Sequence, residues 1–417
     1  MPANLQYKTF FFPVYFEYPV ICKYPTFGMQ SQTNPVSLHP VIIAFDAKRY
    51  FNNSTGLGFY SRTLVEGLRR YYPEHQYLLY TPYNRGRLAA IDDGIRLPDS
   101  WLGRAFHPLW RSRGLTRQLK KDGVQVFHGL SHELPHGLRN AGIRSVVSVH
   151  DLIFMRHPEL YPGIDRYFYE KKYRRAALEA DVVVAISEQT RADLHHFFGI
   201  PEDKIEVIGQ ACDAVFERLS LRHLPDPLAL PVPDEFSLPE DPFLISVGSL
   251  IPRKNWHQLI CALELLKQGG HDIPLVAVGS GKSAYASGLE EQASRAGLRV
   301  HWIRRHLPTE SLAGLYRRAA AMVYPSVFEG FGIPILEAMT VGIPVLTTRG
   351  GCFEEVGGPA ALYASPDQPE EIAAQILQLL RPEVRASLMP AMAKQAAAFA
   401  PEKICATWMQ CYTSLLR

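Results

Sequence analysis

The sequence predicts an α/β protein of two doubly wound domains whose parallel sheets face each other across a cleft. From residue 41 onward, short β-rich runs alternate with amphipathic helical stretches, which is typical of parallel sheets covered by helices. The alternation stops in a proline-dense segment between positions 225 and 242 and then restarts. Such a segment is typical of a stiff connector, and 417 residues are ample for two domains. Ligands of such domains bind outside the carboxyl ends of the strands, so we expect site residues just after strands.

The first domain is predicted over 41–221. Residues 41–45 form a continuous apolar run, which indicates a buried parallel strand, and a glycine loop and a helix over about 59–71 follow it. The later strand candidates are short runs rich in apolar, β-branched and aromatic residues, at 77–80, 124–127, 145–149, 182–186 and 205–208. Helices are expected over about 161–180 and 187–198.

A proline-rich linker is predicted over 222–242, a second domain over 243–398, and a C-terminal helix over 399–417 that packs back towards the first domain. In the second domain, strands are expected at 243–247, 275–278, 300–303, 322–324 and 345–347, and helices over 255–268, 284–296 and 309–320. Residues 1–40 form an N-terminal extension. Their aromatic run at 10–16 contains Pro13 and does not resemble a signal peptide, so we expect a loosely packed arm or a true start at Met29.

Charge and cysteine content exclude several classes of protein. The 44 basic and 41 acidic residues leave a net charge of +3, which is too small to indicate a nucleic-acid partner. The six cysteines are scattered without a C-x-x-C pair, so neither a zinc site nor a redox pair is expected, and a reduced cytosolic setting is the simpler interpretation. No apolar run is long enough to span a membrane.

Three groups of polar or glycine residues follow strands of the first domain. Gly56 and Gly58 precede a helix, where backbone N–H groups attract phosphate, although a tight turn without a ligand is an equal alternative. The dinucleotide fingerprint fails because Ser61 stands where its third glycine is required. His150 and Asp151 come directly after the strand at 145–149, which favours function over a capping role. His128 and His132 follow the strand at 124–127 and are equally compatible with packing.

In the second domain, Gly248 and Ser249 end a strand, and Arg253 and Lys254 open the next helix. The N-terminus of a helix is already positive, so two cations there indicate a bound phosphate or diphosphate. A solvated basic pair is the alternative.

Two glutamates follow the strand at 322–324. Glu329 lies in a glycine-rich loop and Glu337 on the short helix after it, so the two carboxylates can stand at opposite ends of one ligand. The amides of Phe331 and Gly332 can bind between them. Carboxylates accept hydrogen bonds from sugar hydroxyls. Together with a distant cationic clamp for a diphosphate, they describe a nucleotide sugar.

The segment 329–337 resembles the E-x7-E motif of retaining glycosyltransferases of family 4, which have the GT-B fold of two facing Rossmann-like domains with an interdomain cleft. Residues 248–254 resemble that family's donor-diphosphate site, and 54–58 resemble its N-terminal glycine loop. The resemblance covers about 41–400. Within the family, 128–135 and 150–161 look most like bacterial mannosyltransferases of surface-polysaccharide assembly.

The resemblance implies a role for each motif. Glu329 would bind hydroxyls of the donor sugar, Glu337 would hold the ribose, and Arg253 with Lys254 would neutralise the diphosphate. His150 would lie over the sugar, and Asp151 would orient it or the acceptor. The residues implied in donor binding are Gly56, Gly58, Gly248, Ser249, Arg253, Lys254, Leu307, Phe331, Gly332, Ile333 and Glu337.

The reaction implied is transfer of a hexose, mannose from GDP-mannose, with retention of configuration and without a cofactor. The chain has no Asp-x-Asp pair, and the two cations would replace a metal. The alternatives are a UDP-sugar-dependent member of the family, a glycan synthase or phosphorylase, and a non-catalytic nucleotide-sugar-binding scaffold. The missing third glycine argues against an oxidoreductase.

Residues 100–121 contain several cations and no acid, with tryptophan, phenylalanine and leucine interleaved. This pattern predicts a helix at a membrane surface, where a lipid-linked acceptor would be met; a solvated helix with core tryptophans is an equal alternative. The expected partners are a nucleotide sugar and a glycan or lipid-linked acceptor, with no nucleic acid. The expected location is the cytoplasm, peripheral to the inner face of the membrane.

Overall fold

The structure is a computed structural model that describes residues 40–83, 93–220, 236, 238–281 and 283–417. Nearly all of the predicted extension over 1–40, and the prolines of the predicted linker up to Pro233, lie outside the described residues.

Among the described residues, seven parallel strands form the first sheet, in the order β3-β2-β1-β4-β5-β6-β7. The strands are β1 Ile42–Asp46, β2 Gln76–Tyr80, β3 Ile95–Arg96, β4 Val126–Gly129, β5 Arg144–Val149, β6 Val182–Ala185 and β7 Ile205–Val207. The helices connected with them are α1 Lys48–Asn52, α2 Gly56–Tyr71, α3 Trp101–Ala105, α4 His107–Leu109, α5 Leu115–Lys121, α6 Ile153–Arg156, α7 Gly163–Glu179 and α8 Glu188–Phe198.

Six parallel strands form the second sheet within the described residues, in the order β10-β9-β8-β11-β12-β13. The strands are β8 Leu244–Val247, β9 Leu275–Val278, β10 Val300–Ile303, β11 Ala321–Tyr324, β12 Val345–Thr348 and β13 Ala361–Ala364. The helices are α9 Ala214–Arg218, α10 Trp256–Gln268, α11 Ala284–Arg295, α12 Thr309–Arg318, α13 Ile333–Val341, α14 Cys352–Gly357, α15 Pro369–Leu379, α16 Pro382–Ala398 and α17 Pro401–Ser414.

The predicted fold class is confirmed, and its cause is visible in the strands. A parallel strand covered by helices on both faces needs apolar residues at every position, and Val146 and Val147 of β5 are both fully buried. Sequence analysis missed β3 and β13. The first is only two residues long, and the second has two alanines among its four residues, so neither gives a strong β signal.

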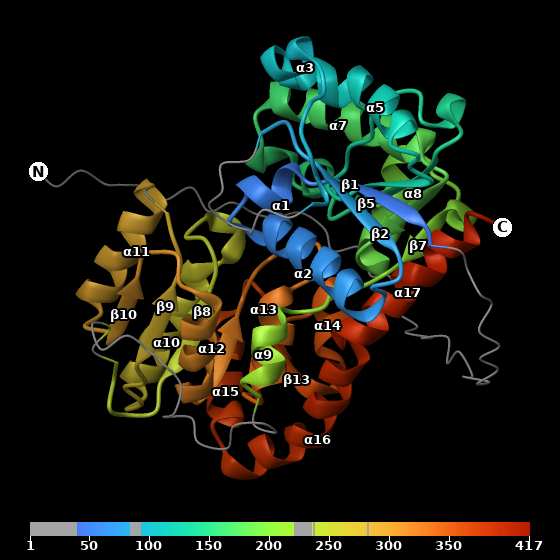
Figure 1. The fold of residues 1–417 in the computed structure, drawn as a ribbon. Helices are drawn as coiled ribbons and strands as arrows, with labels where there is room; N and C mark the ends of the chain where they lie inside the picture. The colour runs from blue at the N-terminus through green and yellow to red at the C-terminus, as the bar shows by residue number, and fades with distance from the viewer. Residues whose placement is uncertain (1–39, 84–92, 221–235, 237, 282) are drawn as a thin grey trace, which may run out of the picture. The chain divides into compact units, whose positions relative to one another are not determined.

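One helix, α9, crosses an expected domain boundary, whereas the C-terminal helix packs towards the first domain, as the sequence predicts. The boundary at 221 assigns α9 to the first domain, yet α9 packs against α12 and α13, and its Phe216 lies in the core of the second domain. Helix α17 packs against α2 (Figure 1), and its Trp408 and Tyr412 lie in one apolar cluster with residues of β1 and β4. The last helix of the chain therefore contributes to the apolar core beside the first sheet.

Candidate active site

The strand orders place one switch point in each sheet, between β1 and β4 in the first and between β8 and β11 in the second. At these points the chain leaves neighbouring strands in opposite directions, which opens a crevice at their carboxyl ends. The loops after β8 and β11 carry Gly248, Arg253, Lys254 and Glu329. The topology therefore explains why residues about eighty positions apart in the chain come together.

The carboxylate of Glu329 is surrounded by donors. Its Oε1 lies 2.7 Å from Arg253 Nη1 and 2.5 Å from Lys254 Nζ, and Ser326 Oγ donates to it at 2.6 Å. Burial by itself would raise the pKa of Glu329, but the charges of Lys254 and Arg253 outweigh burial and lower the pKa to about 2. Glu329 is therefore ionised at any ordinary pH.

The position of the two cations differs from the sequence-based expectation. They were expected at the start of a helix, at a distance from Glu329. Instead they lie on a 3₁₀ turn, Pro252–Lys254, before α10, and both contact the Glu329 carboxylate. Since one acid faces two cations, this cluster keeps one net positive charge that an anion can neutralise. The turn also places the Lys254 ammonium 2.6 Å from the Tyr324 hydroxyl.

Gly248 lies beside the Lys254 side chain, and its positive φ favours glycine there. A Cβ at Gly248 would lie 3.4 Å from Lys254 Cδ, and the backbone there has a φ of 154°. Ser249 contributes through its backbone, because its carbonyl accepts a hydrogen bond from Trp256 Nε1 at 3.0 Å. Gly248 therefore lies next to one of the cations, and Ser249 is bonded to the start of α10.

Glu337 projects from α13, one turn after the glycine-rich loop. The Tyr316 hydroxyl donates to its Oε2 at 3.2 Å. Burial raises the pKa of Glu337 to about 7, with the charge of Asp213 acting in the same direction and the Tyr316 hydrogen bond opposing. The two glutamates of the segment therefore differ in charge near neutral pH.

This difference predicts a pH-dependent affinity for nucleotide. An ionised Glu337 accepts hydroxyl hydrogen bonds more strongly than the protonated acid, and ionisation occurs as the pH rises through about 7. We expect free GDP to bind several-fold more tightly at pH 8.5 than at pH 5.5, as measured by calorimetry. The terminal phosphate of GDP also ionises in this range, so the Glu337→Gln variant should keep the part of the dependence that comes from the ligand and lose the rest. Equal pH dependence in the two proteins would contradict the assignment.

On the first domain, His150 is a neutral, fixed imidazole. Its Nε2 lies 2.9 Å from the Leu130 carbonyl, so Nε2 carries the proton, and its backbone N–H donates to His132 Nε2 at 2.9 Å. Burial lowers its pKa to about 4. The ring packs edge-on against Tyr60, with centroids 4.5 Å apart. At neutral pH, His150 therefore offers a hydrogen-bond acceptor at Nδ1 and no acidic proton.

The other two histidines have different surroundings. His132 stacks on Tyr173, with ring centroids 4.2 Å apart, and supports His150. His128 is fully buried and lies 2.7 Å from the Tyr412 hydroxyl and 2.8 Å from Ser148 Oγ. For His128 the packing alternative is favoured, because both of its ring nitrogens are used inside the core.

The structure brings the His150-Asp151 pair against the Glu329 loop. A Cβ at Gly330 would lie 2.0 Å from the His150 carbonyl oxygen and 3.2 Å from Asp151 Cβ, so only glycine permits this approach. Burial raises the pKa of Asp151, which the positive charge of Arg253 opposes and the negative charge of Glu329 reinforces. Asp151 Oδ1 accepts the Ile153 N–H at 3.1 Å. Residues from both domains thus form one polar site.

The two glycines after β1 lie elsewhere than predicted. Gly56 and Gly58 are in the first turn of α2, not in a loop before it, because the helix begins three residues earlier than expected. Gly58 is required by packing, since a Cβ there would lie 1.8 Å from the Asn53 carbonyl oxygen. Gly56 has open space around its missing Cβ. Gly58 therefore has a structural reason of its own, whether or not a phosphate binds there.

A matched pair of variants tests this distinction. We expect Gly58→Ala to lower the free energy of unfolding by about 1–3 kcal/mol through overpacking, and Gly56→Ala to leave it unchanged or raised. Chemical denaturation of both variants beside the wild type measures the difference. Equal stability of the two variants would show that the backbone at Asn53 moves to accommodate a Cβ at Gly58, and would contradict the packing requirement.

The remaining predicted donor residues surround α13 and β10. Phe331 is buried with its ring edge-on to Phe399, Gly332 is the N-cap of α13 with a φ of 103°, and Ile333 is the first helical residue. Leu307 follows β10 and is buried in the core of the second domain. The N-terminus of α13 thus lies between the two glutamates in the chain.

Sequence analysis missed several side chains of the site. Ser326 and Tyr324 contact the Glu329 cluster, and Tyr316 contacts Glu337. Ser326 gave a signal, since it stands in the same glycine-rich segment three residues before Glu329. Tyr316 gave none, because it lies on α12 in an ordinary amphipathic pattern.

The segment 100–121 is not one continuous helix. It comprises α3, α4, a π turn at Trp110–Gly114 and α5. Trp110 is buried in the first domain, and Arg111 pairs with Asp46 and Glu133, so neither belongs to an exposed surface. Four apolar side chains are nevertheless exposed: Trp101, Leu102, Phe106 and Leu109.

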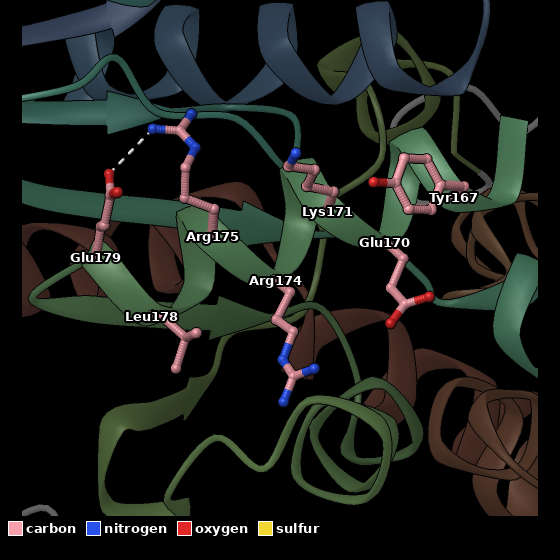
Figure 2. Close-up of a pocket in the computed structure, with 7 residues that line it drawn as sticks. All are labelled: Tyr167, Glu170, Lys171, Arg174, Arg175, Leu178 and Glu179. Atoms are coloured by element: carbon pink, nitrogen blue, oxygen red, sulfur yellow. Dashed lines mark hydrogen bonds and ion pairs between the residues drawn. The ribbon is translucent and has the colours of Figure 1, made fainter. Parts of the chain in front are cut away.

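A second basic stretch, which consists of Lys171, Lys172, Arg174 and Arg175, lies on α7. Figure 2 shows a hollow there that is lined by Tyr167, Lys171, Arg174 and neighbouring residues. Arg175 pairs with Glu179 at 3.0 Å, and Lys172 pairs with Glu133 at 2.6 Å. None of the predicted donor or catalytic residues lines this hollow.

The described part of the chain shows neither a metal-ligand cluster nor a membrane-spanning helix. It contains no group of three or more His, Cys, Asp or Glu side chains arranged to hold a metal ion. None of its helices combines the length and the apolar character that a membrane span requires.

Two family models match the chain, one on each domain. The model described as Glycosyltransferase Family 4 matches residues 54–215, and the model described as Glycosyl transferases group 1 matches residues 233–398.

Curated proteins and solved structures agree with this assignment. The chain is 32% identical to O-antigen chain mannosyltransferase B of Escherichia coli over 61% of this chain and 65% of the relative. It is 30% identical to a GDP-mannose-dependent phosphatidylinositol monomannoside mannosyltransferase of Mycolicibacterium smegmatis over 52% and 57%. The chain thus spans less than two thirds of the length of these relatives.

A solved structure from Anabaena, in complex with UDP and glucose, shares the fold. It is 17% identical, covers 90% of this chain and 100% of its own, and has a TM-score of 0.65. With both family models matched and both sheets in place, the chain belongs to glycosyltransferase family 4 and has the GT-B fold.

Proposed function

We propose that the protein is a metal-independent, retaining glycosyltransferase that moves mannose from GDP-mannose to a glycan or lipid-linked acceptor in bacterial surface-polysaccharide synthesis. The observation that carries this proposal is the Glu329 cluster, in which one carboxylate contacts two cations and the loop that carries it packs against His150 and Asp151. In such a cluster, the carboxylate can accept hydrogen bonds from sugar hydroxyls, and the two cations beside it can bind phosphate.

The proposed chemistry follows from these charges. As the glycosidic bond to phosphate breaks, negative charge grows on the leaving diphosphate and positive charge on the sugar. Arg253 and Lys254 stabilise the diphosphate, and Glu329 accepts hydrogen bonds from sugar hydroxyls. The acceptor hydroxyl attacks the anomeric carbon from the face that the phosphate leaves, and a phosphate oxygen takes its proton. His150, neutral at pH 7, accepts a hydrogen bond from the sugar without protonating it.

The names of the relatives favour mannose as the sugar, and one of them states GDP-mannose as the donor. The Anabaena complex with UDP and glucose keeps a UDP-sugar donor as the second candidate. A non-catalytic nucleotide-sugar scaffold is the third. It is disfavoured because a scaffold has no need of a fixed carboxylate between two cations.

Calorimetric titration with GDP, UDP, GDP-mannose and UDP-glucose, with EDTA present throughout, separates the three. Tight binding of GDP-mannose, followed by mannose transfer in EDTA that magnesium does not increase, would support the proposal. Tight binding of only UDP and UDP-glucose would indicate that the donor is a UDP-sugar and not GDP-mannose. Binding without transfer to any acceptor fraction would favour the scaffold, and transfer that needs magnesium would refute metal independence.

We also propose that the exposed apolar residues of 101–109 contact an anionic membrane surface. Trp101 is 74% exposed and Phe106 is 57% exposed, and the neighbouring Arg104 is exposed as well. Flotation with vesicles that contain phosphatidylglycerol should carry the wild type, and Trp101→Ser/Phe106→Ser should float several-fold less. Equal flotation of both proteins would rule out this surface.

A further inference from the structure

The side chain of Gln189 links the two halves of the site. Gln189 lies in the first turn of α8, directly after β6 of the first domain. Its Nε2 donates to the backbone carbonyl of Glu329 at 3.0 Å, and its Oε1 accepts the backbone N–H of Cys352 at 3.3 Å. Both polar ends of this amide are therefore used on the second domain, one at the loop that carries Glu329 and the other at the start of α14.

Glu355 makes the reciprocal contact from the second domain. From α14, its carboxylate accepts the backbone N–H groups of Glu188 at 2.8 Å and Gln189 at 3.0 Å. These are the first amides of α8, which have no partner within the helix and favour an anion. An acid of α14 thus caps α8 while a side chain of α8 holds the start of α14.

The backbone around this contact is fitted to it. Gly351 has a φ of 56°, and a Cβ there would lie 1.6 Å from Gln189 Oε1. One residue further along α8, Thr190 Oγ1 donates a hydrogen bond to the His150 carbonyl at 3.3 Å. Gly330 of the Glu329 loop lies against the same carbonyl. The start of α8 therefore contacts the backbone of both His150 and Glu329.

We propose that Gln189 and Glu355 form an interdomain clamp that holds the Glu329 loop against the His150-Asp151 pair. Gln189 acts as a positioning residue, since its side-chain hydrogen bonds go to the backbone of Glu329 and Cys352. Its catalytic consequence rests on the proposed function. Arg253, Lys254 and Glu337 all belong to the second domain, so nucleotide binding does not require the clamp, whereas transfer requires both domains.

Kinetics distinguish this role from a merely structural one. We expect Gln189→Leu to lower kcat about tenfold, because a displaced Glu329 loop misaligns the sugar, while the Kd for free GDP changes less than about twofold. Gln378→Leu, at an exposed position of α15, is the matched control and should keep the wild-type kcat. Glu355→Gln, which keeps the shape and one oxygen acceptor, should show a smaller loss of the same kind. Wild-type kcat in Gln189→Leu, or equal losses in kcat and GDP affinity, would overturn the clamp.

Hydrogen exchange followed by mass spectrometry tests the clamp without any activity. Gln189→Leu should speed exchange in the peptide that holds the Cys352 amide, and Glu355→Gln should speed exchange at the first amides of α8. Unchanged exchange in both places would overturn the clamp even if kcat fell. If the wild type transfers no sugar, the proposed function fails, and the exchange result still decides the clamp.

Discussion

Glu329→Gln is expected to lower kcat by about 10²–10³-fold while free GDP binds at least as tightly as to the wild type. The change keeps the shape of the side chain and removes the charge that accepts hydrogen bonds from the sugar, an interaction that strengthens as the transition state forms. Arg253 and Lys254 would lose the anion that they both contact. Their charges would then be more available to a diphosphate. Single-turnover rates and calorimetry with GDP measure the two effects separately.

Stability must be followed in the same variant. Removal of one partner from a buried ion pair costs about 3–5 kcal/mol when the remaining charge stays unpaired. The melting temperature of Glu329→Gln should therefore fall, and saturating GDP should restore more of it than it adds to the wild type. Glu402→Gln, at an exposed position of α17, is the matched control and should change neither value. A loss of GDP affinity as large as the loss of kcat would show that Glu329 serves the nucleotide and not the sugar.

Lys254→Ala is expected to lower kcat/KM by about 10²–10³-fold and to weaken GDP binding as well. Two effects combine here. The diphosphate loses one of its two cations, and Glu329 loses the cation whose charge lowers its pKa the most. The pKa of Glu329 should rise from about 2 in consequence. We therefore expect the remaining activity of the variant to fall more steeply than wild-type activity as the pH is lowered.

Lys403→Ala, at an exposed position of α17, is the control for the loss of a lysine. Arg253→Ala and the double variant complete a thermodynamic cycle. Because both cations contact one carboxylate, their effects should be non-additive, with a coupling of about 0.5–3 kcal/mol. Near-unchanged kcat/KM in Lys254→Ala, or full additivity, would mean that the two cations do not act on one charge.

The contrast between Glu329 and Gln189 shows where sequence reasoning reaches the site and where it ends. Glu329 is identifiable because its carboxylate stands in a glycine-rich loop after an apolar strand, a local pattern that chemistry explains. Gln189 is an ordinary polar residue at the start of a helix. Its importance comes from a carbonyl 140 positions away. No local pattern can indicate such a partner.

For the two cations, the sequence identified the residues but not their position relative to Glu329. Sequence identified Arg253 and Lys254 as an anion-binding pair, because charges of one sign beside a helix start need a counter-charge. It placed the pair away from Glu329, because chain distance is the only distance that a sequence provides. The parallel order β9-β8-β11 brings the two loops to one edge of the sheet, and there the protein supplies its own counter-charge.

The sequence by itself determined the fold class, because burial of a parallel sheet demands apolar strands and amphipathic helices that any stretch of chain displays locally. It also determined the chemical types at the site, since charge and glycine at strand ends are local features. Only the tertiary structure decided that both cations contact Glu329, that Gly58 lies within a helix, that Arg111 is paired, and that α9 packs across the expected domain boundary. Each of these depends on a contact between residues that are far apart in the chain, and only the packing of the folded protein determines which residues meet.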